Sequence, residues 1–537
     1  MRKFEIGKDT MAKPFDRHWQ FCTGSGHAKM AMRADYGKQL RMVQKDLGIR
    51  RVRFHGIFCD DMDTYHTFSD IFPIPVSIPE GQEITEMSFR SIAVAYDNVL
   101  AAGMQPFVEL SFMPKHLAGE DVSGVFYYRP NVCMPKDDRK WTDYITAFVK
   151  FLLNRYGTAE VEEWYFEVWN EPDLQVPFFH GSQEDYFHLY EITARAVKAA
   201  DGHIRVGGPS TSGSKWTAAF IRYCREHDVP VDFVSTHQYA GDPLGGVSDQ
   251  ESEQPDAGLE ANESSPENRM QQAAGLLQTA PKDSILPAFR MLMRDPLEDR
   301  DMPDNVFRTN APVVKRQAGG LPVYYTEWNC SATFGSASND TRKVAAYDVK
   351  TALALEHVID GSSIWSFSDI FEEMHPFPEE FHGGFGMLTQ SGIKKPVYYA
   401  LQMLADVGDE RLVLPEDYLD GEIGMAAFRG KGGLQLLLMR QKMRNRFDLP
   451  KEEAEVCIAC DRKPSEVQIM RIDEDHCNPL KIWESIGSPQ VPTPAQVQDI
   501  QENSAMKAES IPYEFENGVL SIHTELGVND LCLISIK

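Results

Sequence analysis

Two glutamates at the ends of apolar, strand-like runs are the residues of this sequence best suited to chemistry. Glu171 ends the run WYFEVWNE and is followed by Pro172, which has no backbone N–H to donate to a sheet and therefore ends the strand. Glu327 lies near the end of a second run, VYYTEWN, among aromatic neighbours that limit its hydration. A single glutamate at a strand end is usually solvated or paired with a cation. Two of them, each close to an asparagine and to aromatic residues, favour acid/base and nucleophilic work on one bond.

Other polar and aromatic residues occur in or at the ends of further strand-like runs. The run RVRFH places Arg53 and His55 on the same face, because side chains two apart in a strand point the same way, and His237 and Tyr239 have the same spacing. Trp365 lies in the last of the strand-like runs. Aromatic faces can cover the apolar side of a sugar ring while fixed polar groups bind its hydroxyls. If these strands belong to one barrel, the residues predict a sugar-binding site.

Glu109 and Glu167 lie inside strand-like runs rather than at their ends. A buried carboxylate needs a partner that compensates its lost hydration. We therefore interpret both as structural partners for a buried arginine or tyrosine, and as non-catalytic.

These residues are positioned by an alternation of short β-rich runs with longer helical stretches. In the helical stretches apolar residues recur at three- and four-residue steps, as in helices that bury one face. Eight strands alternating with helices over nearly 400 residues predict a (β/α)8 TIM barrel, whose active sites lie at the carboxyl ends of the strands. A doubly wound open sheet is the alternative, but no Gly-x-Gly-x-x-Gly lies between a strand and a helix. The predicted strands are 18–24, 51–58, 105–112, 164–171, 204–209, 231–240, 322–329 and 362–370, and the helical stretches include 36–47, 89–102, 141–156, 183–200 and 343–358.

The helical spacing stops after Leu404. Strand-like runs separated by polar turns follow it, at 434–439, 454–459, 467–472 and 531–536. We therefore assign residues 13–405 to the barrel, and residues 1–12 and 406–537 to a β-sandwich accessory domain.

Two insertions would lie at the carboxyl-terminal face of the barrel. Residues 59–86 are rich in Asp, Pro and aromatic residues, and residues 241–285 are rich in Asp, Glu, Ser, Gly and Gln. The second insertion can bury little apolar surface, so we predict a solvated or partly disordered loop there.

The composition excludes several classes of partner. The 537 residues include 54 basic and 80 acidic side chains, which gives a net charge of −26. Nucleic acid is therefore not expected as a partner, because phosphate binding needs clustered Lys and Arg. No window approaches 18 consecutive apolar residues, so no membrane-spanning helix is predicted. A small neutral molecule such as a sugar is not repelled by this charge.

The cysteines and the N-terminus predict a cytoplasmic protein. The nine cysteines are odd in number and scattered, which favours free thiols over a disulfide framework, and the first residues lack the apolar stretch of a secretory signal. Cys457 and Cys460, with His476 and Cys477, match no common zinc spacing. We expect neither a metal nor a cofactor.

Six segments of the chain resemble glycoside hydrolase family 39, the family of β-xylosidases and α-L-iduronidases, and are most similar to its bacterial β-xylosidases. Asn-Glu-Pro alone occurs in many barrel glycosidases, whereas FSDIFEE and FHGGFG are much more specific. The family also combines its barrel with a β-sandwich. In the family's order, the segments are RVRFHGIF (51–58), ELSFMPK (109–115), EVWNEPD (167–173), TEWN (326–329), WSFSDIFEE (365–373) and FHGGFG (381–386).

The resemblance implies a retaining, exo-acting glycosidase in which Glu171 is the acid/base and Glu327 the nucleophile. Retention requires the two carboxyl groups to be about 5–5.5 Å apart. Glu171 would need to be protonated near neutral pH, with a pKa raised by burial and by the charge of Glu327. Asn170 would hold the sugar 2-hydroxyl. The residues implied to line the sugar subsite are His55, Phe112, Asn170, His237, Tyr239, Trp365 and Glu372.

The identity of the sugar remains open at this point. The resemblance implies xylose released from β-xylosides or small oligosaccharides, but the same mechanism would serve an α-L-iduronidase, an arabinosidase, a β-glucosidase or a β-galactosidase. A uronate would need several converging Lys or Arg residues, and only Arg53 is an obvious candidate. Ser-Thr-His at 235–237 also departs from the Arg-His frequent in bacterial members. A non-catalytic sugar-binding protein is disfavoured because both glutamates are present. Self-association is a further expectation from the family.

Overall fold

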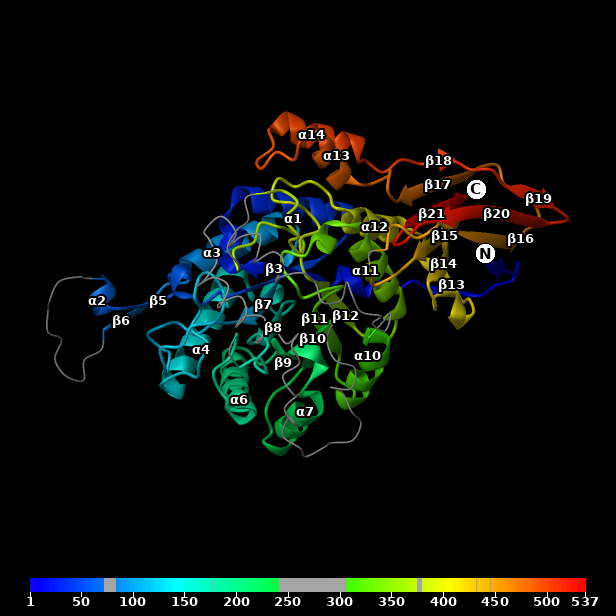
Figure 1. The fold of residues 1–537 in the computed structure, drawn as a ribbon. Coiled ribbons are helices and arrows are strands. Elements are labelled where there is room, and N and C mark those ends of the chain that lie inside the picture. Colours follow the sequence, from blue (N-terminus) through cyan, green and yellow to red (C-terminus); the bar gives the residue numbers. More distant parts are fainter. Residues whose placement is uncertain (72–83, 176, 241–305, 374–378, 431, 445) are drawn as a thin grey trace, which may run out of the picture.

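A closed barrel of eight parallel strands forms the centre of the molecule (Figure 1). The computed structural model describes residues 1–71, 84–175, 177–240, 306–373, 379–430, 432–444 and 446–537. Going round the barrel, each strand pairs with the next one along the chain, and the last pairs with the first. The barrel strands are β3 (Cys22–His27), β4 (Arg51–His55), β7 (Gln105–Leu110), β8 (Tyr165–Val168), β9 (Arg205–Thr211), β10 (Phe233–Tyr239), β11 (Val323–Asn329) and β12 (Gly361–Ile364).

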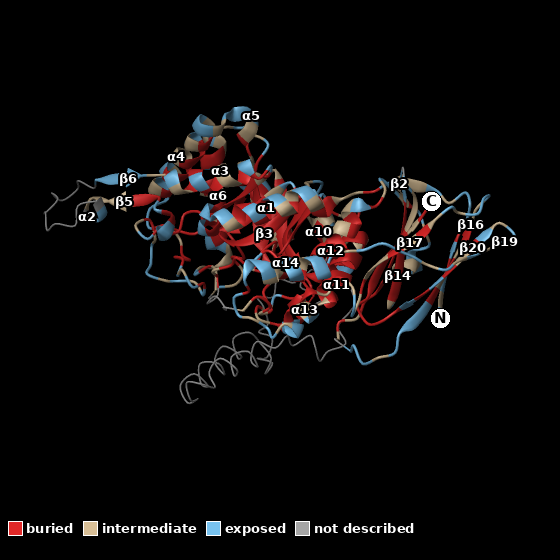
Figure 2. Ribbon diagram, turned by 90° about the horizontal axis from the view of Figure 1, so that it is seen from above, coloured by how far each residue is buried: buried red, intermediate tan, exposed pale blue. Residues whose placement is uncertain are grey.

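Helices surround the barrel and connect its strands. Most of the long helices bury one face against the strands and expose the other, which Figure 2 shows as red and pale blue sides of the ribbons, whereas the helices Arg342–Ala354 and Pro396–Asp406 are buried over most of their length. These helices are α1 (Ala34–Leu47), α3 (Arg90–Ala101), α4 (Asp138–Tyr156), α6 (Gln183–Ala200), α7 (Thr217–Glu226), α10 (Val306–Gln317), α11 (Arg342–Ala354) and α12 (Pro396–Asp406). Shorter elements in the loops are η1 (His18–Gln20), η2 (Ala28–Met32), η3 (Asp60–Met62), β5 (Tyr65–Thr67), α2 (Phe68–Ile71), β6 (Thr85–Met87), α5 (Thr158–Val161), η4 (Ser212–Ser214) and η6 (Ala337–Asp340).

The fold class predicted from the sequence is confirmed, with several local differences. The strands predicted at 51–58, 105–112 and 164–171 end earlier, at His55, Leu110 and Val168. Residues 18–20, predicted to begin the first strand, form the 3₁₀ helix η1, because the His18 ring hydrogen-bonds the Ser362 hydroxyl and the Ala352 carbonyl. The last strand ends at Ile364, so Trp365 follows the strand instead of lying within it. Beyond that point the backbone of residues 366–369 hydrogen-bonds residues 385–388, which draws the chain out of the barrel.

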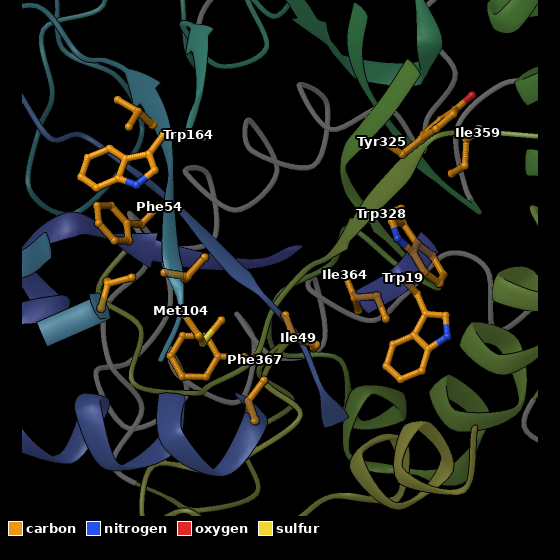
Figure 3. Packing of buried hydrophobic residues seen from close by; sticks show 14 of the residues in the cluster. Trp19, Ile49, Phe54, Met104, Trp164, Tyr325, Trp328, Ile359, Ile364 and Phe367 are labelled. Atoms are coloured by element: carbon orange, nitrogen blue, oxygen red, sulfur yellow. The ribbon is translucent and has the colours of Figure 1, made fainter. Parts of the chain in front are cut away.

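The main hydrophobic core fills the layer between the barrel strands and the helices. Large aromatic side chains dominate it, and Figure 3 shows Trp19, Trp328 and Ile364 together on one side of the barrel and Phe54 with Trp164 on the other. A separate aromatic cluster around Phe21, Phe107 and Phe233 fills the barrel interior near the starts of the strands. These packed layers hold the strand ends in fixed relative positions.

Two further β-sheets lie beside the barrel and contain both chain termini (Figure 1). One has the strand order β1-β16-β20-β19 and the other β18-β17-β21-β15-β14-β13-β2. The domain boundaries given above stay predictions, but β1 and β2 both belong to these sheets. The strands are β1 (Arg2–Ile6), β2 (Ala12–Pro14), β13 (Glu410–Leu412), β14 (Ile423–Gly430), β15 (Gly433–Arg440), β16 (Glu452–Ala459), β17 (Val467–Ile472), β18 (Glu509–Ser510), β19 (Glu514–Glu516), β20 (Val519–Leu526) and β21 (Leu531–Ile536), with η7 (Glu416–Tyr418) before β14.

The seven-stranded sheet is buried on both faces. Along β15, Leu436 and Leu438 pack in the core between the two sheets, whereas Leu437 and Met439 pack in the barrel's core. Adjacent side chains of a strand point to opposite faces, so the run LLLM at 436–439 is apolar at successive positions because each face has its own core. The sheet is therefore a layer shared by the sandwich and the barrel.

Two helices that the sequence analysis did not predict interrupt the β-rich part of the chain. They are α13 (Pro479–Ser485) and α14 (Pro494–Asn503), and Thr493 and Gln496 form a capping box at the start of the second. Trp483 and Ile500 pack against Phe381 and Ile393 of the barrel. In the part of the chain that the structure describes, no helix has the length and apolarity needed to cross a membrane. The insertion 241–285 lies outside the described residues.

The shared sheet predicts how substitutions in β15 act on stability. Leu437→Ala should lower the free energy of unfolding by about 2–5 kcal/mol, because it leaves a cavity at the contact between sheet and barrel. Val519→Ala, at a position 37% exposed, should cost less than about 1 kcal/mol. Urea unfolding followed by tryptophan fluorescence measures both. Equal midpoints for the two variants would contradict a packed contact at Leu437.

Candidate active site

The guanidinium of Arg53 lies at the centre of the barrel's polar residues. It is fully buried in β4 and contacts three carboxylates, those of Glu109 (2.8 Å), Glu167 (2.6 Å) and Glu327 (2.8 Å). Burial alone would lower the pKa of Arg53, but the three carboxylates raise it overall. Glu109 and Glu167 are thus partners of a buried arginine, as the sequence predicts, and Glu327 is held by the same cation.

Glu327 is kept as a carboxylate by several hydrogen-bond donors and positive groups. Its Oε1 accepts from Arg53 Nη1, and its Oε2 accepts from the Tyr239 hydroxyl at 2.9 Å. Burial alone would raise its pKa, but the charges of Arg53 and His55 and the hydrogen bond from Tyr239 hold the pKa below its ordinary value. A buried carboxylate that stays ionised and has a fixed orientation can act as a nucleophile.

Glu171 has a different environment, although it lies close to Glu327. It follows β8 with φ of +41°, and Trp169 two residues earlier has φ of +73°. Such left-handed conformations are costly for bulky residues and occur mostly at functional sites, where the surrounding structure maintains them. The Glu171 N–H donates to the Ser210 carbonyl at 2.9 Å, which fixes the turn.

The Glu171 side chain is paired with a histidine. Its Oε1 lies 3.0 Å from Nδ1 of His237, whose pKa is lowered by burial. A neutral imidazole can donate to a carboxylate or accept from a carboxylic acid, depending on its tautomer. The pair therefore suits a group that gives and takes a proton, whereas Glu327 is fixed as an anion.

The separation of the two glutamates fits one reaction geometry. A carboxylate oxygen of Glu171, a ring nitrogen of His237 and a carboxylate oxygen of Glu327 all lie within 4.8 Å of one another. Glycosidases that retain configuration have carboxyl groups about 5–5.5 Å apart, against about 6.5–9.5 Å in inverting enzymes. The same three ligand atoms could hold a metal ion. In the described residues, Cys457, Cys460, His476 and Cys477 form no such group.

His55 connects the arginine network to a further glutamate. Its Nδ1 lies 2.7 Å from Glu109, and its Nε2 lies 3.4 Å from Glu327 and 3.6 Å from Glu373. Burial alone would lower the pKa of His55, but Glu109 and Glu373 raise it to about 9. The imidazole is therefore protonated at neutral pH and presents a positive edge to both carboxyl groups.

Glu373, which the sequence analysis did not select, has an unpartnered polar atom at the site. Its Oε1 is buried without a hydrogen-bond partner in the part of the chain described, and burial raises its pKa to about 8. Glu372, the residue that was selected, is half-buried, and its charge acts on Arg33. The two glutamates are adjacent in a segment without regular structure, so no periodicity in the sequence indicates which one faces inward.

Aromatic side chains form one wall of the site. The Trp365 ring lies 4.9 Å from the His55 ring and packs edge-on against Phe371 at 5.9 Å. Phe112 is fully buried and packs edge-on against Trp169 at 5.4 Å, behind His55. Asn170 is also buried, and its Oδ1 accepts from Arg53 at 2.9 Å.

The structure brings most of the predicted site residues together at the carboxyl ends of the barrel strands. Glu171, Glu327, His55, Asn170, His237, Tyr239 and Trp365 form one connected group, Phe112 lies behind it, and the half-buried Glu372 takes part in none of these contacts. Arg53 is the residue whose importance was underestimated. The segment RVRFH already indicated a role for Arg53 at the site, because Arg53 lies on the same strand face as His55.

Comparisons with known proteins agree with this geometry. The model of the family "Glycosyl hydrolases family 39" matches residues 2–272 and 297–519. A β-xylosidase of Caldicellulosiruptor saccharolyticus is 32% identical over 503 residues, which are 94% of this chain and 91% of the relative. A β-xylosidase of Geobacillus stearothermophilus is 32% identical over 97% of this chain and 93% of its own. The crystal structure of a monomeric β-xylosidase from Caulobacter crescentus superposes with a TM-score of 0.73, at 28% identity, over 100% of this chain and 99% of that one.

The raised pKa of Glu373 predicts a pH dependence of stability. The folded protein keeps this proton up to about pH 8, whereas the unfolded chain releases it near 4.5, so this group makes stability fall as pH rises between those values. In Glu373→Gln that contribution is absent, and the fall in thermal midpoint between pH 5.5 and 8.5 should be smaller than in the wild type. Glu372→Gln is the matched control and should keep the wild-type slope. Identical slopes in all three proteins would show that Glu373 ionises normally.

Proposed function

The chain belongs to glycosyl hydrolase family 39, a family of retaining glycosidases, and we propose that it releases xylose from the non-reducing ends of β-xylosides. The observation that carries the mechanism is the pair Glu171 and Glu327, which lie within 4.8 Å of each other and have different hydrogen-bond partners. The proposed sugar comes from the two relatives that align with nearly the whole chain, both of which are β-xylosidases.

We propose Glu327 as the nucleophile and Glu171 as the acid/base. In the first step, a carboxylate oxygen of Glu327 attacks the anomeric carbon, the bond to the leaving oxygen breaks, and the Glu171 proton goes to that oxygen. In the second step, Glu171 takes a proton from water, the water oxygen bonds to the anomeric carbon, and the bond to Glu327 breaks. Two inversions give net retention.

The surroundings of the two glutamates support this division of roles. Glu327 accepts hydrogen bonds from Arg53 and from the Tyr239 hydroxyl, so it stays ionised before attack. Glu171 is paired with the neutral His237 and lies close to the negative charge of Glu327, which favours its protonated form. That charge disappears when Glu327 becomes an ester, and Glu171 then loses its proton more easily. The same residue can therefore serve as an acid first and a base second.

Several groups are placed to bind the sugar in this scheme. The unpartnered Oε1 of Glu373 and the nearby Nε2 of His55 can share one hydroxyl, as acceptor and donor. Trp365 supplies an aromatic face beside them. We assign Asn170 to the 2-hydroxyl, because Arg53 fixes the orientation of its amide. Glu373 thereby replaces Glu372 in the proposed subsite.

The charges at the site support a neutral sugar over a uronate. Arg53 was the one obvious arginine for a sugar carboxylate, but its guanidinium is engaged by Glu109, Glu167 and Glu327. Glu373 adds a further acidic group. The protonated His55 is likewise shared by Glu109, Glu327 and Glu373. A uronate would therefore find both nearby cations already engaged by carboxyl groups, and an iduronidase is disfavoured.

We also propose that the protein is cytoplasmic. All nine cysteines are free thiols, and seven of them are buried, which suits a reducing compartment. Self-association, suggested by the family resemblance, stays a prediction.

Substitution of the two glutamates should separate their roles. Glu327→Ala should abolish turnover of every aryl β-xyloside. Glu171→Ala should slow substrates with poor leaving groups by about 10²–10⁴-fold, because they need the acid. It should slow the first step of a dinitrophenyl xyloside much less, because that leaving group departs without a proton. Stopped-flow and steady-state release of the phenol measure both, and wild-type rates in either variant would refute its assigned role.

The glycone can be identified with aryl glycosides that differ only in the sugar. The wild-type enzyme should hydrolyse the β-xyloside with the highest kcat/KM among xyloside, arabinoside, glucoside, galactoside and iduronide. Product configuration, followed by proton NMR of the first-formed xylose, should be β. A higher kcat/KM on another sugar would overturn the substrate and leave the mechanism in place, whereas an α product would overturn the mechanism.

A further inference from the structure

Lys395 is a fully buried lysine outside the set of residues that would touch the sugar. Its ammonium lies 2.6 Å from Asp340 and 2.6 Å from Asp369, and it donates to the Gly384 carbonyl at 3.0 Å. The ammonium therefore has two carboxylates and one backbone carbonyl within contact distance. Burial alone would lower the pKa of Lys395, but the two aspartates raise it overall, so the group stays charged.

The three partners of Lys395 come from three different segments beside the site. Asp340 ends η6, in the connection after β11, the strand that carries Glu327. Asp369 lies midway between Trp365 and Glu373, four residues from each. Gly384 belongs to the loop 381–386, the FHGGFG segment. One ammonium therefore joins segments that are far apart along the chain and lie close to the sugar-binding groups.

The two aspartates also hold the backbone of the loop 381–386. Asp340 accepts from the Gly383 N–H at 2.7 Å, and Asp369 accepts from the Gly386 N–H at 2.7 Å. The glycines are needed for this approach, since a Cβ at Gly384 would lie 2.3 Å from the Asp369 carboxylate. The FHGGFG segment is thus shaped to wrap around the two carboxylates that Lys395 holds.

The loop transmits its position to the site through aromatic contacts. Phe385 packs against Phe371 with ring centroids 6.0 Å apart, Phe371 packs against Trp365 at 5.9 Å, and Trp365 lies 4.9 Å from His55. The Phe385 carbonyl also accepts from the Ser366 N–H, next to Trp365. The catalytic glutamates have separate supports, in Arg53 and in His237.

We propose that Lys395 is a positioning residue for sugar binding, which places Trp365 and Glu373 through Asp369, Asp340 and the loop 381–386. This inference rests on the function proposed above, and it goes beyond it by separating the support of the sugar-binding wall from the support of the reacting carboxyl groups. Loss of the ammonium should weaken binding of the sugar in the ground state and the transition state alike. It should leave the chemical step nearly intact.

Lys395→Met removes the charge while keeping the length of the side chain. The KM for the aryl glycoside that the wild type hydrolyses best should rise about tenfold or more, with kcat falling less than about threefold, because uniform binding is lost. Inhibition by the free sugar should weaken by a similar factor. Hydrogen exchange should be faster at the amides of residues 381–386.

The neighbouring Lys394 provides a matched control. It pairs with Asp46 of α1 at 2.8 Å, away from the loop 381–386. Lys394→Met should therefore keep the wild-type KM, kcat and loop exchange. If Lys395→Met does not fold, the variant Asp340→Asn is measured in its place. It leaves the Lys395 ammonium paired with the Asp369 carboxylate and keeps an acceptor for the Gly383 N–H. Its KM should rise about threefold or more while kcat changes little.

The outcomes separate this inference from the function on which it rests. Equal KM values and equal loop exchange in the Lys394 and Lys395 variants would overturn the positioning role alone, as would a fall in kcat at unchanged KM. Hydrolysis of a sugar other than xylose would overturn only the proposed glycone, since the comparison uses the best substrate. Absence of hydrolysis of any glycoside by the wild type would overturn both.

Discussion

The contact of one buried guanidinium with three carboxylates is the constraint on which the rest of the site depends. Arg53 in β4 can reach Glu109, Glu167 and Glu327 only if β7, β8 and β11 keep their register around the closed barrel. Removing the cation would leave three buried acids, and removing an acid would alter the charge felt by the others. The position of Glu327, the proposed nucleophile, is therefore set by the whole barrel and not by its own strand.

The two catalytic candidates illustrate how environment divides the work of identical side chains. Glu327 faces an arginine, a tyrosine hydroxyl and a protonated histidine, whereas Glu171 faces a histidine that burial keeps neutral. No property of a glutamate in isolation distinguishes an acid from a nucleophile. The distinction comes from the placement of positive groups around each carboxyl group. In the proposed scheme it also comes from the loss of the Glu327 charge on ester formation, which makes Glu171 lose its proton more easily.

Sequence reasoning predicted the barrel well, because each strand has its own local pattern, although β8 ends at Val168 and not at Pro172 as the sequence suggested. It predicted the glutamate pair for the same reason. Sequence reasoning was less informative in segments without regular secondary structure. The segment DIFEE contains two adjacent glutamates, and only the fold shows that Glu373 lies against His55. The partners of Lys395 are distant in sequence and lie on loops, so no spacing links them. Helix α14 was missed although TPAQ, its capping box, was legible in the sequence.

The sheet that is apolar on both faces has a consequence for the history and engineering of such proteins. A module that can be exchanged between proteins needs a polar surface of its own, but here Leu437 and Leu533 belong to the barrel's core while Leu436 and Ile534 belong to the sandwich. Cutting the chain after the barrel would expose an apolar surface on both fragments. The two parts are therefore expected to have diversified together, and grafting this barrel onto another protein would require redesign of a whole strand face.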